Sequence, residues 1–407
     1  MQEVATITSC KTLLPITSYG SLSAMIIVEK PFVSEPLITW MEQTQHPVLN
    51  NDMAQELVVQ GHNLALCDDE TAARRIAAGE RTYTNSENAL GWIFDHVDNQ
   101  ELLDAISVFK DKHETRVRLA ELDPTLYYRT VTFDEVQNLD YTHLPERFVI
   151  KPSTGFGSMG VYMVESAEGL ADAKNHIAKD YTIWLERYPK AVIQAGEFII
   201  EEYIEGQEYA LEAYFDEEGA VHLLNVLRHD FSDDTDMSDR LYVTSPAMME
   251  EMREQFISWL EDVNRILRVK NVAVHPEVRL NETGIHVIEF NPMRFMGMGG
   301  TDISWYAYGI RSFEVFLENK HLDWEKIYAE NKERTFATMI LNPPTDTPET
   351  AVFDYAALDA KLPTILSPRR FSYPATGLFG FYILDITNAT DEQRDFMLHS
   401  DLSEFIS

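Results

Sequence analysis

The segment from Phe148 to Val164, FVIKPSTGFGSMGVYMV, constrains the fold more than any other part of the sequence. Its apolar start, Phe148–Ile150, predicts a short buried strand, and β-rich residues resume at Val161. The loop between them holds three glycines: Gly155, Gly157 and Gly160. Glycine lets backbone N–H groups turn toward a ligand without a Cβ in the way, so such a loop can hold phosphate oxygens. Lys151 at its base would add a positive charge beside the same anion.

Three known motifs match this loop in part. Its letters fit G-x-G-x-x-G, but the dinucleotide-binding fingerprint requires a helix after the loop, and here a strand is predicted. A Walker A loop would end in Gly-Lys-Ser/Thr, whereas Val161 follows Gly160. A protein-kinase loop has the right strand context, yet neither H-R-D nor D-F-G occurs downstream. A plain glycine-rich hairpin therefore stays open as an alternative.

The charge of the chain limits the class of partner. The 407 residues include 67 acidic and 33 basic side chains, which gives a formal net charge of −34. Nucleic acid and anionic membranes are therefore not expected as partners, because phosphate contacts need clustered Lys and Arg. The acid surplus is most simply a source of solubility, and a preference for cationic substrates is the sharper interpretation.

Neither the cysteines nor the apolar runs indicate secretion or membrane insertion. Cys10 and Cys67 lie far apart and match no zinc-binding spacing, which predicts a reducing, cytoplasmic location. No apolar run reaches the length of a transmembrane helix. Residues 1–20 lack the charged and apolar regions of a secretion signal, so we expect either a poorly ordered extension or a start codon set too far upstream.

Short apolar strands alternate with helical patterns in the first hundred residues. The predicted strands cover 23–29 and 47–50, and the predicted helices cover 34–44, 70–79 and 89–97. This alternation predicts a small α/β domain with a parallel sheet. A long helix is predicted over 102–122, and Lys110 and Lys112 would belong to its solvated face unless their context gives them another role.

The remaining chain is predicted to mix both element types. Helices are expected at 168–179 and 248–267, and strands at 335–341, 351–355 and 377–386. The acidic segment Asp230–Asp239 lacks the glycine and glutamate of an EF-hand, so it is expected to be a flexible surface loop.

Two acidic residues follow the apolar strand Phe198–Ile200. Gly206 then interrupts the pattern, and strand-like alternation resumes at Glu208. The adjacent acids Glu201 and Glu202 are consistent with an exposed strand end. They are equally consistent with a hinge that hydrogen-bonds the edge of an adenine, in which Glu208 would accept hydrogen bonds from ribose hydroxyls.

Two antiparallel strands are predicted at 272–279 and 285–294, and acidic residues interrupt both. Alternation places Val287, Glu289 and Asn291 on one face, opposite Glu277 of the neighbouring strand. Oxygen donors of this kind suit Mg²⁺, whose coordination shell is often completed by phosphate oxygens. Carboxylates within apolar strands are costly unless they are paired or bind a metal. The alternative is a solvated sheet face.

Taken in order, these residues resemble the ATP-grasp superfamily of carboxylate–amine ligases. The resemblance covers roughly Phe109 to Gly300 and rests on the order of Lys112, Lys151 with its glycine loop, Glu201-Glu202, Glu208, Glu277 and Glu289-x-Asn291-Pro292. It implies an α/β fold with an N-terminal parallel domain and two ATP-grasp subdomains that hold a nucleotide between them. The implied boundaries are 1–20 for the extension, 21–108 for the N-terminal domain, 109–200 for the lid subdomain and 201–407 for the C-terminal subdomain.

The resemblance implies ATP and two Mg²⁺ ions as cofactors, with Mn²⁺ as a substitute. ATP would contact Lys112, Lys151, Gly155, Gly157, Ser158, Gly160, Glu201, Glu202, Tyr203, Ile204 and Glu208. The metal ligands would be Glu277, Glu289 and Asn291. Lys151 and Arg294 would be the catalytic cations. Many members read Asn-Pro-Arg where this chain reads Asn-Pro-Met-Arg, so Arg294 comes one residue later than the family pattern.

The implied reaction forms an acylphosphate from a small-molecule carboxylate and ATP, and an amine then displaces phosphate. The chain is most like the L-amino-acid ligases, which make dipeptides, and this implies substrate contacts at His275, Arg279, Arg294 and Gly300. A homodimer is compatible with this resemblance. The alternative function is an ATP-grasp kinase, in which the phosphorylated small molecule would be the product.

Overall fold

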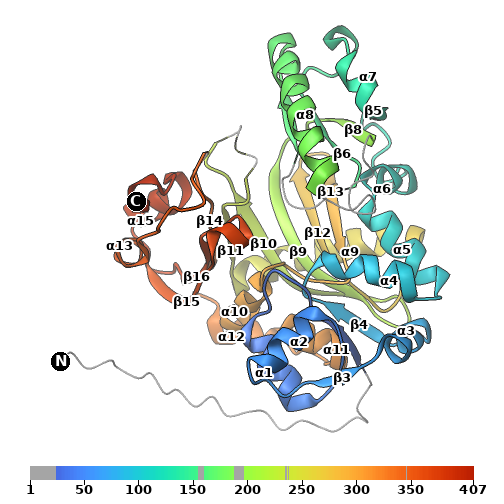
Figure 1. Cartoon of the computed structure of the whole chain (residues 1–407), viewed down its shortest axis with the longest axis vertical. Coiled ribbons are helices and arrows are strands. Elements are labelled where there is room, and N and C mark those ends of the chain that lie inside the picture. Colours follow the sequence, from blue (N-terminus) through green and yellow to red (C-terminus); the bar gives the residue numbers. More distant parts are fainter. Residues whose placement is uncertain (1–23, 155–159, 188–196, 234–235, 237, 345) are drawn as a thin grey trace.

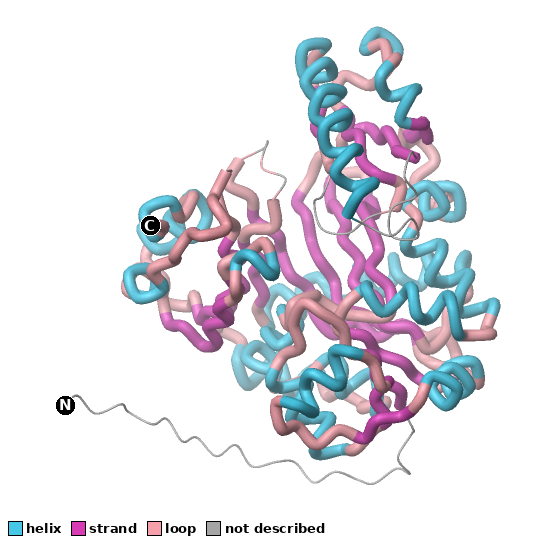
Figure 2. Tube along the Cα trace, viewed as in Figure 1, coloured by secondary structure: helices cyan, strands magenta, loops and turns pink. Residues whose placement is uncertain are grey.

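The computed structural model describes residues 24–407 apart from 155–159, 188–196, 234–235, 237 and 345. The expected extension at residues 1–20 lies outside this range. The described chain forms three sheets, which occupy different parts of the molecule (Figures 1 and 2). No helix in the described ranges is both long enough and apolar enough to cross a membrane.

The first sheet is parallel, as the alternating pattern predicts. Its strand order is β3-β2-β1-β4, and each neighbouring pair is parallel. The strands are β1 (Ala24–Ile27), β2 (Pro47–Leu49), β3 (Ala65–Cys67) and β4 (Arg81–Thr84). The helices that accompany them are α1 (Glu35–Thr44), α2 (Asp52–Val59), α3 (Asp69–Ala77) and α4 (Leu90–His96). All residues of β1 and β4 are buried, and the hydrophobic core beside them continues into the third sheet and its helices.

The second sheet is antiparallel and carries the glycine loop. It has the order β5-β8-β6-β7 and consists of β5 (Tyr128–Thr132), β6 (Phe148–Pro152), β7 (Tyr162–Val164) and β8 (Glu197–Glu202). The predicted strand–loop–strand arrangement is confirmed, because β6 and β7 pair with Phe148 opposite Val164. The helices α7 (Phe133–Gln137) and α8 (Ala167–Arg187) lie beside this sheet at the top of Figure 1. We call this unit the lid sheet.

The third sheet has eight strands in the order β13-β12-β9-β10-β11-β14-β16-β15, and all its neighbouring pairs are antiparallel. Its strands are β9 (Gln207–Phe215), β10 (Val221–Asp230), β11 (Leu241–Thr244), β12 (Val272–Asn281), β13 (Gly284–Pro292), β14 (Phe336–Leu341), β15 (Thr364–Arg370) and β16 (Gly380–Asp385). The accompanying helices are α9 (Pro246–Leu267), α10 (Ile303–Tyr308), α11 (Ser312–Glu318), α12 (Trp324–Asn331), α13 (Tyr355–Asp359), α14 (Tyr373–Thr376) and α15 (Asp391–His399). We call this unit the large sheet. The large sheet lies between the lid sheet, the N-terminal sheet and the C-terminal helices (Figure 1). With a parallel N-terminal sheet and two antiparallel sheets, the predicted α/β fold class is confirmed.

The predicted helix over 102–122 is wrong in one respect, because it is broken at Asp111. The chain forms α5 (Gln100–Lys110) and α6 (Lys112–Arg118) instead. Asp111 has an extended backbone, and its side chain accepts hydrogen bonds from the N–H groups of His113 and Glu114. An aspartate in this position caps a new helix and so favours a restart. The break also lets the N–H of Lys112 donate to the carbonyl of Ser153 at the end of β6.

The C-terminal prediction is also partly wrong. Residues 351–355 do not form a strand; Phe353 makes an isolated bridge to Ile406, and α13 follows. The edge strand β15 was not predicted, because Pro368 and two arginines interrupt its apolar pattern. Proline is tolerated at a sheet edge, where its missing N–H costs no ladder hydrogen bond.

Candidate functional site

Strands β12 and β13 bring the predicted metal ligands together at the edge of the large sheet. Glu277 lies directly opposite Glu289, and His275 lies opposite Asn291. The register then shifts, so that Val287 pairs with Val278. Because Val278 follows Glu277 and points to the other face, Val287 does so too. The prediction that Val287 shares a face with Glu289 is therefore wrong, whereas the pairing of Glu277 with Glu289 is as predicted.

The restart of the helix at Lys112 directs two lysines into the protein. Lys112 Nζ lies 2.8 Å from Glu289 Oε2, and its side chain is only 10% exposed. Lys110 forms a buried ion pair with Glu87, which comes from the short 3-10 helix η1 (Glu87–Ala89). The interpretation of these lysines as a solvated helix face is wrong. Phe109 packs on Phe290 with ring centres 4.7 Å apart and so holds α5 against β13.

A buried ion triad lies where α6 meets the lid sheet. Glu201 Oε2 is 2.6 Å from Lys151 Nζ, and its Oε1 is 2.5 Å from Arg116 Nε. Burial alone would raise the pKa of Glu201, but the charges of Arg116 and Lys151 lower it to about 2. Burial lowers the pKa of Lys151, whose partner Glu201 also pairs with Arg116. Two cations around one carboxylate leave a local excess of positive charge, which suits an anion.

The segment Glu202–Ile204 connects the lid sheet to the large sheet, and its contact with adenine stays a prediction. The N–H of Glu202 donates to Tyr127 and that of Tyr203 donates to Arg147. Arg279 reaches this segment from β12, and its Nη1 donates to the carbonyl of Ile204 at 2.7 Å. Backbone hydrogen bonds beside the lid sheet and the side chain of Arg279 from the large sheet therefore hold this segment in place.

Glu208 is held inside the protein by two neighbours. Arg279 Nε donates to its Oε2 at 3.0 Å, and His229 Nδ1 lies 2.8 Å from its Oε1. The side chain of Arg279 is 7% exposed, so its ion pair with Glu208 lies inside the protein. His229 stacks on Tyr242 with ring centres 4.1 Å apart, so this wall of the site is aromatic as well as acidic.

The side chain of Glu277 is 20% exposed, and like charges surround its carboxylate. Burial raises its pKa well above the ordinary value, and the charges of Glu289, Asp239 and Glu208 raise it further. Asp239 belongs to the acidic segment expected to be a flexible surface loop, but it is half-buried and accepts a hydrogen bond from Tyr242 at 2.6 Å. Sequence patterns did not distinguish Asp239 from the other acids of that segment. Such a cluster of carboxylates fits a site that binds a cation.

The structure also tests whether these residues form a metal centre by themselves. Within the described part of the chain, no group of three or more His, Cys, Asp or Glu side chains is spaced to hold a metal ion. Glu289 forms its ion pair with Lys112. Burial would raise the pKa of Glu289, but Lys112 lowers it to about 2, so this carboxylate is ionised at pH 7.

Arg294 lies beside the N-terminal domain. Its Nη2 is 2.5 Å and its Nε 3.1 Å from Glu87 Oε1, so Glu87 joins Arg294 and Lys110 through one buried carboxylate. Glu87 was not predicted, because it lies in a polar stretch without a motif.

His275 is buried with Nδ1 at 2.9 Å from the carbonyl of Leu211, and burial lowers its pKa to about 3, so it is neutral at pH 7.

Glu212 is a further buried carboxylate that the sequence did not single out. It accepts hydrogen bonds from Ser312 at 2.7 Å, from Ser304 at 3.1 Å and from the N–H of Met296 at 3.3 Å. Burial raises its pKa to about 7. It therefore supports the loop from Met296 to Gly300 that follows Arg294. The predicted substrate residue Gly300 packs within this loop against Met296, which leaves no room for a Cβ.

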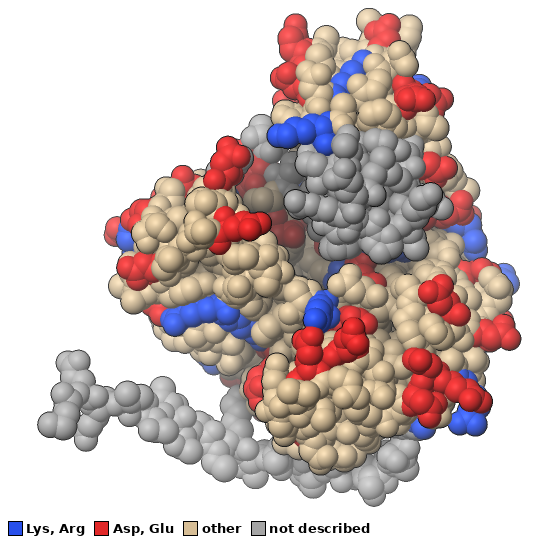
Figure 3. Space-filling view, in the orientation of Figure 1, with Lys and Arg blue, Asp and Glu red and all other residues tan. Residues whose placement is uncertain are grey.

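Three residues of the predicted nucleotide site, Gly155, Gly157 and Ser158, lie outside the described residues. Gly160 is described and adopts a left-handed backbone with a φ of 74°, a conformation that favours glycine. In the space-filling view the molecule is hollowed between the upper lobe and the left lobe, and acidic side chains are visible inside this hollow (Figure 3).

The fold and the order of the charged residues are those expected of an ATP-grasp domain. Residues 144–302 match the family model described as "ATP-grasp domain", so the chain contains such a domain and the predicted resemblance is confirmed.

Known proteins extend this comparison. The alanine–anticapsin ligase of Bacillus subtilis (strain 168) is 26% identical over 179 residues, which cover 42% of this chain and 38% of that protein. An L-amino acid ligase from Bacillus licheniformis matches with a TM-score of 0.64 at 18% identity, over 96% of this chain and 99% of that one. A carboxyaminoimidazole ribonucleotide synthase from Aspergillus clavatus, complexed with ATP, has a TM-score of 0.62 at 14% identity, over 94% and 99%. The two structures share the fold of this chain.

Proposed function

We propose that the protein is an ATP-dependent ligase that joins a carboxylate to an amine. The observation that carries this proposal is the pairing of buried cations with buried carboxylates at the junction of the lid sheet and the large sheet. Lys112 pairs with Glu289, and Lys151 pairs with Glu201. Magnesium-bound ATP brings both charges, because its phosphate oxygens suit the lysines and its metal suits the carboxylates.

The residues present fit Mg²⁺ as the metal. Glu277, Glu289 and Asn291 would hold it through oxygen atoms, and Asp239 adds a carboxylate beside them. Buried carboxylates that repel one another are costly without a cation, and this cost favours metal binding. When bound, the ion would neutralise charge on the phosphates. The number of ions remains a prediction.

The chain itself would act mainly by positioning and by charge. The substrate carboxylate attacks the γ-phosphorus of ATP, which gives an acylphosphate and ADP; the amine then attacks the acyl carbon, loses a proton and displaces phosphate. Lys112 and Lys151 would hold the phosphates, and Arg294 would stabilise the phosphoryl group in transfer. Neutral His275 cannot add a competing positive charge at this point. Such electrostatic preorganisation is the main demand of phosphoryl transfer.

We propose amino acids as the two substrates, with a dipeptide as the product. This proposal rests on the similarity to the alanine–anticapsin ligase in sequence and to the L-amino acid ligase in fold. The ATP-bound carboxyaminoimidazole ribonucleotide synthase shares the fold, so ligases of other carboxylates are the natural competitors. Cytoplasmic location and a homodimer remain predictions.

The test measures phosphate release from Mg-ATP with pairwise mixtures of the twenty amino acids, and identifies products by mass spectrometry. A dipeptide with ADP and phosphate is expected, and Glu289→Ala should abolish it. Glu282→Ala is the matched control, because Glu282 is exposed in the turn between β12 and β13 and should retain activity. If no pair of amino acids causes phosphate release, the dipeptide proposal is refuted. A stable phosphorylated product with ADP would instead favour the kinase.

A further inference from the structure

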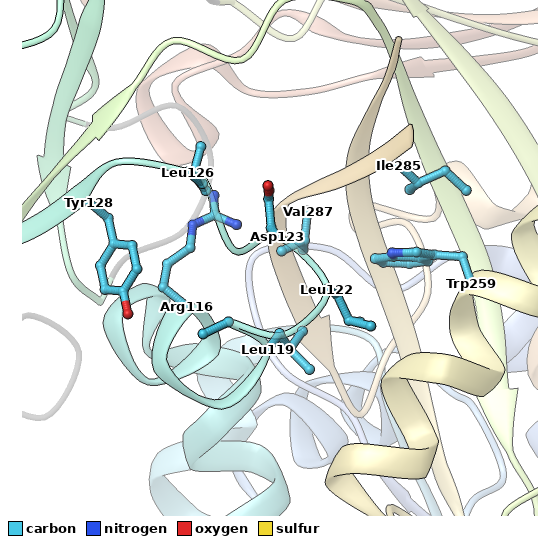
Figure 4. A pocket seen from close by; sticks show the side chains of 10 residues that line it. Arg116, Leu119, Leu122, Asp123, Leu126, Tyr128, Trp259, Ile285 and Val287 are labelled. Carbon is cyan, nitrogen blue, oxygen red and sulfur yellow. The ribbon is translucent and has the colours of Figure 1, made fainter. Parts of the chain in front are cut away.

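An apolar pocket lies on the opposite face of β13 from Glu289. It encloses about 350 Å³ of empty space, part of which is open to solvent. Its apolar walls come from the loop after α6, from α9 and from β13: Leu119, Leu122, Leu126, Trp259, Ile285 and Val287. Figure 4 shows Trp259 at one end and Arg116 with Tyr128 at the other.

Arg116 gives this apolar pocket a charged end. Its side chain is 4% exposed, and its Nε donates to Glu201. Among the described residues, its buried Nη2 has no hydrogen-bond partner. A buried guanidinium N–H without an acceptor is costly, so a ligand oxygen at this point would relieve that cost. The other charged group at the pocket, Asp123, is already held by His286 Nδ1, which lies 2.9 Å from its Oδ2.

We propose that this pocket binds a small organic carboxylate with a short aliphatic chain. The carboxylate accepts a hydrogen bond from Arg116 Nη2, and the chain packs between Leu122, Val287 and Trp259. Charge complementarity selects an anion, and the apolar walls select against inorganic ions, which cannot replace water along those walls. This site is separate from the nucleotide site, because the side chain of Val287 points to the face of β13 opposite Glu289.

The pocket is linked to the nucleotide site through one side chain. Arg116 shares Glu201 with Lys151. A carboxylate bound to Arg116 would neutralise part of its charge, so Glu201 would be drawn more strongly to Lys151. Both changes reduce the positive charge available for phosphate. The ligand and ATP should therefore weaken each other's binding by the same factor, a consequence that rests on the proposed nucleotide site.

The test titrates the full chain with sodium butyrate by isothermal calorimetry, with sodium chloride and 1-butanol as ligand controls. Butyrate should bind in a saturable manner, and neither control should. Two variants address the pocket: Val287→Phe fills it from β13, and Arg116→Lys keeps the charge beside Glu201 but removes Nη2. Val117→Phe is the matched control, because Val117 lies on the same helix and is 45% exposed. Its butyrate affinity should equal that of the unaltered chain.

We expect each pocket variant to weaken butyrate binding at least tenfold. The proposal would be overturned if butyrate showed no saturable binding, if 1-butanol bound as well, or if Val287→Phe and Arg116→Lys bound butyrate like the unaltered chain. Thermal unfolding of each variant checks that it is folded. A second titration, with ATP in the presence of butyrate, tests the coupling. If ATP itself does not bind, the proposed function fails, while the butyrate result stands on its own.

Discussion

Replacing Glu201 with glutamine removes the negative charge of the buried triad and keeps its shape. Arg116 and Lys151 would then be two buried cations without a counter-ion. The pKa of Glu201 is lowered from 4.5 to about 2. Since one pKa unit corresponds to about 1.4 kcal/mol, the loss of stability at pH 7 should be about 3 kcal/mol. This value agrees with the ~3–5 kcal/mol typical of breaking a buried ion pair.

The same pKa fixes the sign of the pH dependence. Because the folded-state pKa lies below the unfolded value, ionised Glu201 stabilises the fold above pH 4.5, and this stabilisation is lost as the pH falls toward 2. The difference between the unaltered chain and Glu201→Gln should therefore shrink by roughly 1.4 kcal/mol between pH 7 and pH 3.5.

Amide hydrogen exchange in β6 and β8 measures this loss locally, and guanidinium unfolding measures it for the whole chain. A local loss of about 3 kcal/mol should speed exchange in these strands roughly a hundredfold at pH 7. Glu202→Gln is the matched control, since Glu202 is adjacent and only half-buried, and it should change stability by no more than about 0.5 kcal/mol. Equal stability of the two variants, or a difference that does not change with pH, would refute the reasoning.

Three further predictions address other parts of the site. Lys112→Gln should lower ATP affinity at least tenfold in calorimetry, because the lysine charge that pairs with Glu289 is lost; unchanged affinity would contradict its phosphate role. Arg279→Lys should lower ATP affinity about tenfold through the lost hydrogen bond to Ile204 and leave the choice of amino acids unchanged, whereas an altered product spectrum would support a substrate role instead. Burial raises the pKa of Glu212 to about 7, so protonated Glu212 stabilises the fold below pH 4.5 and this stabilisation, roughly 3 kcal/mol, is lost as the pH rises through 7. In denaturant titrations, the free energy of unfolding of Glu212→Gln should fall less with rising pH than that of the unaltered chain. An equally steep fall in both would contradict the role of Glu212.

Local patterns in the sequence were sufficient for much of the fold. Alternating strands and helices predicted the parallel N-terminal sheet, and the apolar runs around the glycines predicted the hairpin of β6 and β7. The pairing of Glu277 with Glu289 followed from two adjacent strands joined by a short turn. These features depend on neighbours within a few tens of residues, so periodicity and turn signals record them.

Register and helix breaks were less accessible to sequence reasoning. The shift that moves Val287 to the other face depends on how β12 and β13 accommodate each other, and alternation along one strand cannot reveal it. The break at Asp111 depends in part on a partner from β6, since the N–H of Lys112 donates to Ser153. A long periodic pattern therefore predicted one helix where two exist.

The sequence by itself determined which residue types the site would contain, because their order along the chain matches the ATP-grasp pattern. Only the tertiary structure decided which charges meet. Glu87, Arg116 and Asp239 carry no local signal, yet burial brings them beside Arg294, Glu201 and Glu277. Coulomb interactions and desolvation depend on distance and on exclusion of water rather than on sequence separation. For this reason the charge balance of the site, and the pocket behind it, emerge only when the lid sheet and the large sheet are packed together.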